Sequence, residues 1–147
     1  MMIVKFEPQH LETLLLQPSQ AMMQSIINKP GYGESLAAAG PAYSAVDGDQ
    51  VFACMGMIPQ WEDRAIAWGL ISAEAGQHFR AITKAVLRSM ELHPFRRIET
   101  AVACNFPQGH RWVRMLGFER EGTMRAYTPF GDDCDLYARV RWKHLPH

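Results

Sequence analysis

Cysteine is scarce in this sequence, and the spacing of its three cysteines excludes two common stabilising frameworks. Cys54, Cys104 and Cys134 are odd in number and far apart, so they suggest neither a disulfide framework nor a zinc knuckle. The six histidines include no His-x-x-x-His pair and therefore offer no ligand set for zinc. A Walker-type phosphate loop is also absent, so this route to nucleotide binding is excluded.

An excess of charge of one sign is missing too, because Lys+Arg and Asp+Glu number 15 each. No global field therefore favours nucleic acid or anionic lipid. Six arginines crowd the C-terminal part, where we expect solvated faces: Arg96, Arg97, Arg111, Arg114, Arg120 and Arg125. No apolar run reaches the length of a transmembrane helix, and the N-terminus lacks a signal-peptide pattern. We expect a soluble, cytoplasmic protein that binds no membrane and no specific nucleic-acid sequence.

The sequence does have a globular composition, with 48% hydrophobic and 20% charged residues in a chain of 147. This length fits one domain over residues 1–147. Apolar periodicity and Gly/Pro breakers predict the order β-α-α-β-β-β-α-β-α-β-β. The expected strands cover 3–6, 42–46, 51–58, 64–71, 97–104, 118–128 and 133–142; the expected helices cover 11–15, 22–27, 79–93 and 107–116, with a helical turn at 34–39. This order predicts an α+β fold in three layers, a mixed sheet with helices on both faces.

The most informative segment is the C-terminal third, which reads as a strand, a short helix, a glycine stop and another strand. Asn105 ends the first strand, Trp112 lies within the helix, and Gly117-Phe118 follows it. This pattern resembles the GNAT superfamily of acyl-CoA N-acetyltransferases, in which Asn, an aromatic residue and Leu-Gly-Phe recur at this spacing. The resemblance extends over essentially the whole chain. It implies that acetyl-CoA lies in a V-shaped opening between the strands 64–72 and 97–104.

Gly69 falls where the family often has a β-bulge, and a glycine inside a strand is a reasonable bulge residue. A bulge would leave the backbone N–H groups of Leu70, Ile71 and Ser72 free to bind the pantetheine arm or to polarise the thioester carbonyl. The alternative is that Gly69 only makes room for Trp68.

The loop that opens the long helix is expected to bind pyrophosphate, because free amides and the helix dipole favour an anion there. The family motif is Gln/Arg-x-x-Gly-x-Gly/Ala, whereas this chain has Ala75 at the first position and replaces the two glycines. Its cofactor-binding candidates are Gly76, Gln77, His78, Phe79 and Arg80. His78 and Arg80 either donate charge-assisted hydrogen bonds to the phosphates or fill the site with their side chains.

In the family, the residue matching Asn105 hydrogen-bonds the pantetheine arm or the following helix, and an N-cap is the alternative role for Asn105. Trp112 stands where many members place a tyrosine that protonates the departing thiolate. An indole N–H is no general acid, so we expect Trp112 to pack near the cofactor while another group or water supplies the proton.

The general base is the least defined part of the site. Glu62, Asp63 and Glu34 are the nearest carboxylates by topology, and Glu99 faces either solvent or the sheet surface. From these we select Glu62 as the catalytic candidate. Tyr127, near the last hairpin, is the second candidate, because it could enter the acceptor pocket. Cys104 and His110 could form a thiol nucleophile and its base, but a buried free cysteine at a strand end explains Cys104 better.

The resemblance thus implies direct transfer of an acetyl group from acetyl-CoA to a primary amine, either of a small molecule or of a protein N-terminus or lysine. The run Leu116–Thr123 also resembles the subgroup that acts on protein N-termini, although this run is common in the superfamily. The alternative is a non-catalytic protein of the same fold, such as a phage structural or host-interaction protein. The degenerate loop at Ala75–Arg80 and Trp112 favour this alternative. A homodimer or a phage or host protein partner fits either function.

Overall fold

The computed structural model describes residues 1–141, so the expected end of the last strand at residue 142 lies outside the described residues. The strands are β1 (Met2–Lys5), β2 (Ala42–Asp47), β3 (Gln50–Trp61), β4 (Arg64–Ile71), β5 (Arg97–Ala103), β6 (Glu119–Met124) and β7 (Cys134–Val140). The α-helices are α1 (Gln24–Ile27), α2 (Tyr32–Ala39), α3 (Phe79–Leu92) and α4 (Pro107–Met115). Three 3₁₀ turns are η1 (Pro8–Leu11), η2 (Pro18–Met23) and η3 (Gly76–His78).

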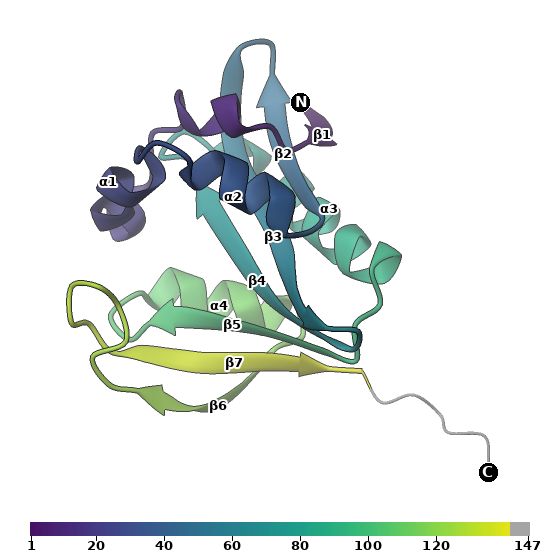
Figure 1. Cartoon of the computed structure of the whole chain (residues 1–147), viewed down its shortest axis with the longest axis vertical. Coiled ribbons are helices and arrows are strands. Elements are labelled where there is room, and N and C mark those ends of the chain that lie inside the picture. Colours follow the sequence, from purple (N-terminus) through teal and green to yellow (C-terminus); the bar gives the residue numbers. More distant parts are fainter. Residues whose placement is uncertain (142–147) are drawn as a thin grey trace.

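The strands form one sheet in the order β1-β2-β3-β4-β5-β7-β6. Helix α2 covers one face of the first half of this sheet, while α3 and α4 cover the opposite face (Figure 1). The expected α+β architecture, with a mixed sheet and helices on both faces, is therefore confirmed. None of the helices within residues 1–141 has the length and apolar character needed to cross a bilayer.

Apolar side chains from both faces of the sheet hold these layers together. On the α2 side, Leu36 packs in one cluster with Phe6 and Leu70. On the α3 side, Ile82 is fully buried in a cluster with Phe52 and other residues of the sheet. The alternation of side chains along a strand explains why the same strands supply both cores.

The strands β4 and β5 pair in parallel over a short distance only. The ladder joins Arg64–Ile66 to Arg97–Glu99 and then stops, although both strands continue. Figure 1 shows the two strands converging towards the β3–β4 turn and diverging in the other direction. The expectation that these strands are parallel and separate at their C-terminal ends is confirmed.

The helix expected over residues 11–15 is wrong. Leu14 and Leu16 are buried while Leu15 between them is 61% exposed, which is the period of an extended chain and not of a helix. Leu16 forms an isolated antiparallel bridge with Ser72, just past the end of β4. Three consecutive leucines had concealed this alternation, because their periodicity fits either structure.

Two strand boundaries and one bulge also differ from expectation. Strand β3 passes through Pro59 to Trp61, with a register irregularity between these residues that accommodates the proline. Strand β6 ends at Met124 and not at residue 128. No register shift occurs at Gly69, which lies opposite Met55 in a regular ladder, so the expected bulge is wrong. The helix stop at Gly117 is confirmed by its left-handed φ of 91°.

Candidate functional site

The opening between β4 and β5 begins directly after their short ladder. The Thr100 hydroxyl donates a hydrogen bond to the carbonyl of Ala67 at 3.0 Å, which is a cross-link at the start of the opening. The Ser72 N–H donates to a carbonyl of β3, that of Phe52, at 2.8 Å. Backbone polar groups alternate in direction along a strand, so those of Gly69 and Ile71 face the opening.

A segment from the N-terminal region already occupies this edge of β4; we call residues 15–20 the strap. The Gln20 side-chain amide donates to the Gly69 carbonyl at 2.9 Å, and its oxygen accepts from the Ile71 N–H at 2.9 Å. The Gln17 N–H donates to the Ile71 carbonyl, also at 2.9 Å. The strap therefore satisfies the backbone of β4 much as a neighbouring strand would.

The expectation that the amides of Leu70, Ile71 and Ser72 are free is consequently wrong. Leu70 lies opposite Cys54 in the β3–β4 ladder, Ile71 donates to Gln20, and Ser72 donates to β3. The sequence could not reveal this arrangement, because the partner of the Ile71 N–H is the side chain of Gln20, 51 residues earlier in the chain.

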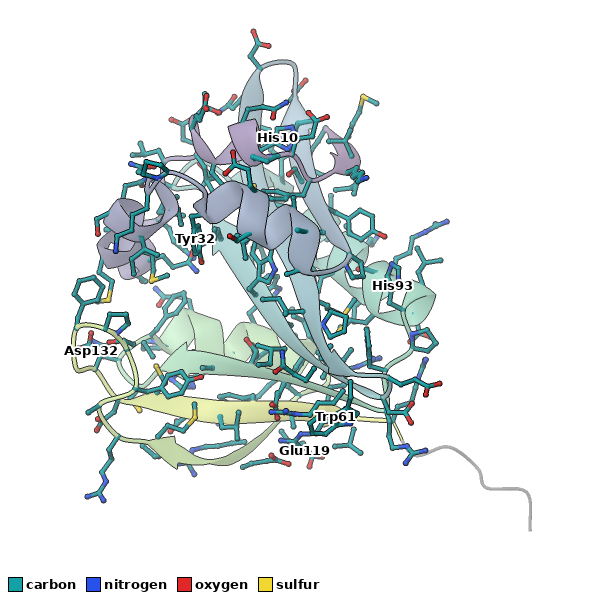
Figure 2. The ribbon with its side chains drawn as sticks, viewed as in Figure 1. His10, Tyr32, Trp61, His93, Glu119 and Asp132 are labelled. Atoms are coloured by element: carbon teal, nitrogen blue, oxygen red, sulfur yellow. The ribbon has the colours of Figure 1, made fainter. Side chains whose placement is uncertain are left out.

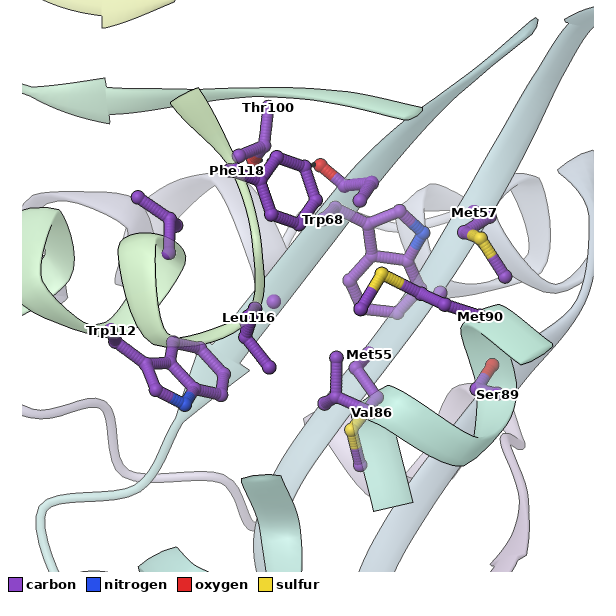
Figure 3. A pocket seen from close by; sticks show the side chains of 14 residues that line it. Met55, Met57, Trp68, Val86, Ser89, Met90, Thr100, Trp112, Leu116 and Phe118 are labelled. Carbon is purple, nitrogen blue, oxygen red and sulfur yellow. Dashed lines mark hydrogen bonds between the residues drawn. The ribbon is translucent and has the colours of Figure 1, made fainter. Parts of the chain in front are cut away.

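Behind the opening, between α3, α4 and the sheet, lies a cavity of about 70 Å³ (Figure 3). Its lining is mostly apolar, with Val86, Met90 and Leu116 among the side chains, and Ser89 and Thr100 contribute its hydroxyls. None of the described lining residues is ionisable. Pockets for whole small molecules occupy about 300–1,000 Å³, so this cavity in its present form holds only a small group.

Trp112 connects α4 to α3, the two helices that form the outer wall of the cavity. Its indole N–H donates to the Thr83 hydroxyl at 2.9 Å, and its ring lies 5.4 Å from that of Phe79. This contact agrees with the packing role expected for Trp112. Because the indole N–H is already engaged, it has no free donor to offer a leaving group.

The loop before α3 places its candidate residues at the N-terminus of that helix. Gln77 and Arg80 are exposed, whereas the His78 ring lies 4.3 Å from the ring of Phe52. Ala75 is buried, so no polar side chain substitutes for the family's Gln or Arg at that position. A side chain at Gly76 would meet open space, so that glycine is not required by packing. The loop thus places one exposed cation, Arg80, at the positive end of the α3 dipole.

Of the two catalytic candidates, Glu62 lies away from the opening between β4 and β5. It lies in the turn between β3 and β4, at the end where β4 and β5 are paired. The opening begins after Ile66 and widens away from this turn, and the catalytic role of Glu62 stays a prediction. Trp61, the residue before Glu62, lies opposite Arg64 at this closed end of the sheet (Figure 2).

Tyr127, the second catalytic candidate, lies at the end of the sheet where β4 and β5 separate. It is 55% exposed and belongs to the loop between β6 and β7. The strand after this loop begins at Cys134, which pairs with Ala103 at the C-terminal end of β5.

Asn105, directly after β5, is exposed and does not cap α4, because the N-cap residue is Phe106. Its capping role is therefore wrong, while its role toward a cofactor stays a prediction.

The alternative chemistries gain no support. Cys104 is exposed and not buried as expected, and its thiol lies 3.5 Å from Asp135. Partial desolvation and this carboxylate raise the pKa of Cys104, which disfavours the nucleophilic thiolate. His110 contacts the Tyr137 hydroxyl at 2.8 Å and is not hydrogen-bonded to the thiol. Within residues 1–141, no three His, Cys, Asp or Glu side chains gather as metal ligands would.

Comparisons with known proteins agree on the fold. No protein-family model matches the chain, and no curated protein matches its sequence. An aminoglycoside 6'-N-acetyltransferase complexed with coenzyme A aligns with a TM-score of 0.70 at 11% identity, over 99% of this chain and 100% of that one. A GNAT family acetyltransferase from Elizabethkingia anophelis with acetyl-CoA bound aligns with a TM-score of 0.67 at 12% identity, over 95% and 97% of the two chains. A mutant spermidine N-acetyltransferase from Vibrio cholerae gives 0.66 at 14% identity, over 95% of both chains. The chain has the GNAT fold.

Proposed function

We propose that this protein is an N-acetyltransferase that moves an acetyl group from acetyl-CoA to a primary amine. The observation that carries the proposal is the edge of β4 beyond the β4–β5 ladder, which binds an amide. Gly69 offers a carbonyl and Ile71 an N–H to the same carboxamide. The structural neighbours with coenzyme A or acetyl-CoA bound support the same ligand class.

The chemistry of this edge fits the pantetheine arm of coenzyme A, which carries two amides. The Gln20 carboxamide stands in for such an amide, since it donates to Gly69 and accepts from Ile71. Arg80 and Gln77 at the start of α3 would hold the phosphates through charge-assisted and neutral hydrogen bonds. Asn105 and Tyr127 lie at the end of the sheet where the arm and the amine would meet.

When bound, acetyl-CoA supplies an acetyl group activated as a thioester. The chain contributes mainly position and exclusion of water. The apolar cavity lined by Val86, Met90 and Leu116 would keep the reacting carbonyl dry. The Gly69 N–H faces the opening and could stabilise charge on an acyl oxygen there. Because the described lining residues are not ionisable, we assign the removal of the amine proton to water.

Calorimetric titration with acetyl-CoA, followed by melting in its presence, tests the proposal. At about a hundred dissociation constants of ligand, stability should rise by about 2.7 kcal/mol. Arg80→Ala should weaken binding about tenfold, since a hydrogen bond to a charged group contributes about 1.5–3 kcal/mol. Arg88→Ala, an arginine further along α3, is the matched control and should bind normally. No heat and no thermal shift at millimolar acetyl-CoA would reject the enzyme.

The second candidate is a non-catalytic protein of this fold that serves as a structural or host-interaction component. The filled edge of β4 and the small volume of the cavity favour it. Binding of acetyl-CoA followed by acetylation of any amine in a panel would exclude this function. Binding without turnover across the panel would leave the acceptor to be identified.

A further inference from the structure

We propose that the strap is a built-in competitor of the cofactor: Gln20 occupies the amide position on β4 and must leave before acetyl-CoA binds. This inference rests on the proposed function and adds a means of regulating the same site. Gln20 satisfies the same two backbone groups, on Gly69 and Ile71, that the proposed cofactor site uses. The two occupants therefore exclude each other.

The first half of the strap is anchored in the core. Leu16 is 5% exposed and lies in the cluster that contains Leu70. The Gln24 side chain accepts from the Leu16 N–H at 3.3 Å and donates to the Leu14 carbonyl at 3.2 Å. The Ala73 N–H also donates to the Leu15 carbonyl at 2.9 Å. This half is expected to stay in place when the opening is used.

The second half of the strap is held far more weakly. Turn η2, which contains Gln20, has no buried residue. Met22 in the same turn is 43% exposed, whereas Met23 at the end of the turn packs against the core cluster that contains Leu16. Only the first part of the turn, up to Gln20, can therefore lift without uncovering apolar surface. This movement would break chiefly the hydrogen bonds of Gln20 and the one from Gln17 to Ile71. The strap can thus open at Gln20 while its buried Leu16 stays in the core.

Occupation of the β4 edge by Gln20 would reduce the apparent affinity for acetyl-CoA, because only the molecules in which Gln20 has left this edge can bind the cofactor. Two hydrogen bonds of ordinary strength correspond to about a tenfold bias towards the closed form. Gln20→Ala and Gln20→Met remove both hydrogen bonds to β4, together with the one that Gln20 accepts from the Gln17 side chain at 3.2 Å, and Met keeps the length of the side chain. Ser19→Ala is the control, because Ser19 is exposed in the same turn and forms no side-chain hydrogen bond within the described residues.

The experiment combines calorimetric titration with acetyl-CoA and amide hydrogen exchange in the free proteins. Both Gln20 variants should bind acetyl-CoA about tenfold more tightly than the unmodified protein and Ser19→Ala. Exchange at Ile71 should accelerate in the Gln20 variants, whereas exchange at Ala73, which donates to Leu15, should not change. This internal reference distinguishes release of Gln20 from a general loss of folding.

Each outcome decides a different point. Tighter binding with faster exchange at Ile71 supports the competitor. Equal affinity in all four proteins overturns it but leaves the proposed function intact. Absence of binding in every protein, including both Gln20 variants, overturns the proposed function and the competition with it. Unchanged exchange at Ile71 in folded Gln20 variants contradicts the occupation of the edge by Gln20.

Discussion

The two ends of the β4–β5 pair are held in different ways. At the closed end, the buried carboxylate of Glu99 receives charged hydrogen bonds from Arg64 and Arg97, and Arg97 also pairs with Glu121. The ring of Trp61 lies 4.8 Å from the Arg64 guanidinium. At the open end, no strand within residues 1–141 pairs with the edge of β4 that faces β5. The strap forms hydrogen bonds with this edge in place of a strand.

This difference separates a fixed end from an adjustable one. The closed end is held by side chains that belong to the strands and their hairpins. The open end is filled from a segment about fifty residues away, through a turn with no buried residue. One strand can therefore be rigid where it supports the fold and exchangeable where a ligand would bind.

Removing the charge at the closed end should have the largest effect. Glu99→Ala leaves two partly buried arginines without their shared partner, and we expect a loss of about 3 kcal/mol in unfolding free energy. Urea unfolding measures this change. The control is Glu121→Ala, whose more exposed carboxylate pairs with Arg97 and should contribute less than about 1 kcal/mol. Equal losses in the two variants would contradict the central role of Glu99.

A substitution outside the β4–β5 pair calibrates the comparison. Gly117, between α4 and β6, has a φ of 91°, and an added side chain would meet Arg139 at 3.4 Å. We expect Gly117→Val to lower the unfolding free energy by about 1–2 kcal/mol, because a β-branched residue is strained there. Hydrogen exchange at Ile71 should remain as in the unmodified protein relative to global stability. Unchanged urea unfolding would rule the prediction out.

Loosening the strap at its anchor should have a moderate effect confined to the open end. Gln24→Ala removes the hydrogen bonds to Leu16 and Leu14, and we expect a loss of about 1 kcal/mol. Amide exchange should accelerate at Ala73 as well as at Ile71, in contrast to the Gln20 variants. Protection that changes equally throughout the sheet would show that the anchor is not local.

The smallest effect concerns pH and a carboxylate on β7, outside the β4–β5 pair. Hydrogen bonds from Arg120 and Thr123 lower the pKa of Asp135 below its ordinary value of 3.8. A lowered pKa adds stability that is complete above the ordinary value and disappears as the pH falls through the folded-state value. Asp135→Asn should therefore shift the urea midpoint slightly at neutral pH, and the shift should shrink as the pH falls below the ordinary value of 3.8. A constant difference at every pH would contradict this assignment.

Much of the fold could be predicted from the sequence. Hairpin turns, breakers and the stripe along α3 are local signals, and so is Gly117, whose left-handed conformation follows from its place after a helix. The failures occurred where two structures share one local pattern. Three consecutive leucines fit a helix as well as an extended strap, and a glycine inside a strand fits a regular ladder as well as a bulge.

By itself, the sequence determined the order of the elements and the segment from Asn105 to Phe118 that indicated the GNAT fold. Only the tertiary structure decided how the β4 edge is occupied. Gln20 and Ile71 are 51 positions apart, and their hydrogen bond depends on where the buried Leu16 fixes the strap. Backbone periodicity acts over a few residues, whereas the partner of an unpaired strand edge is chosen by packing of the whole chain.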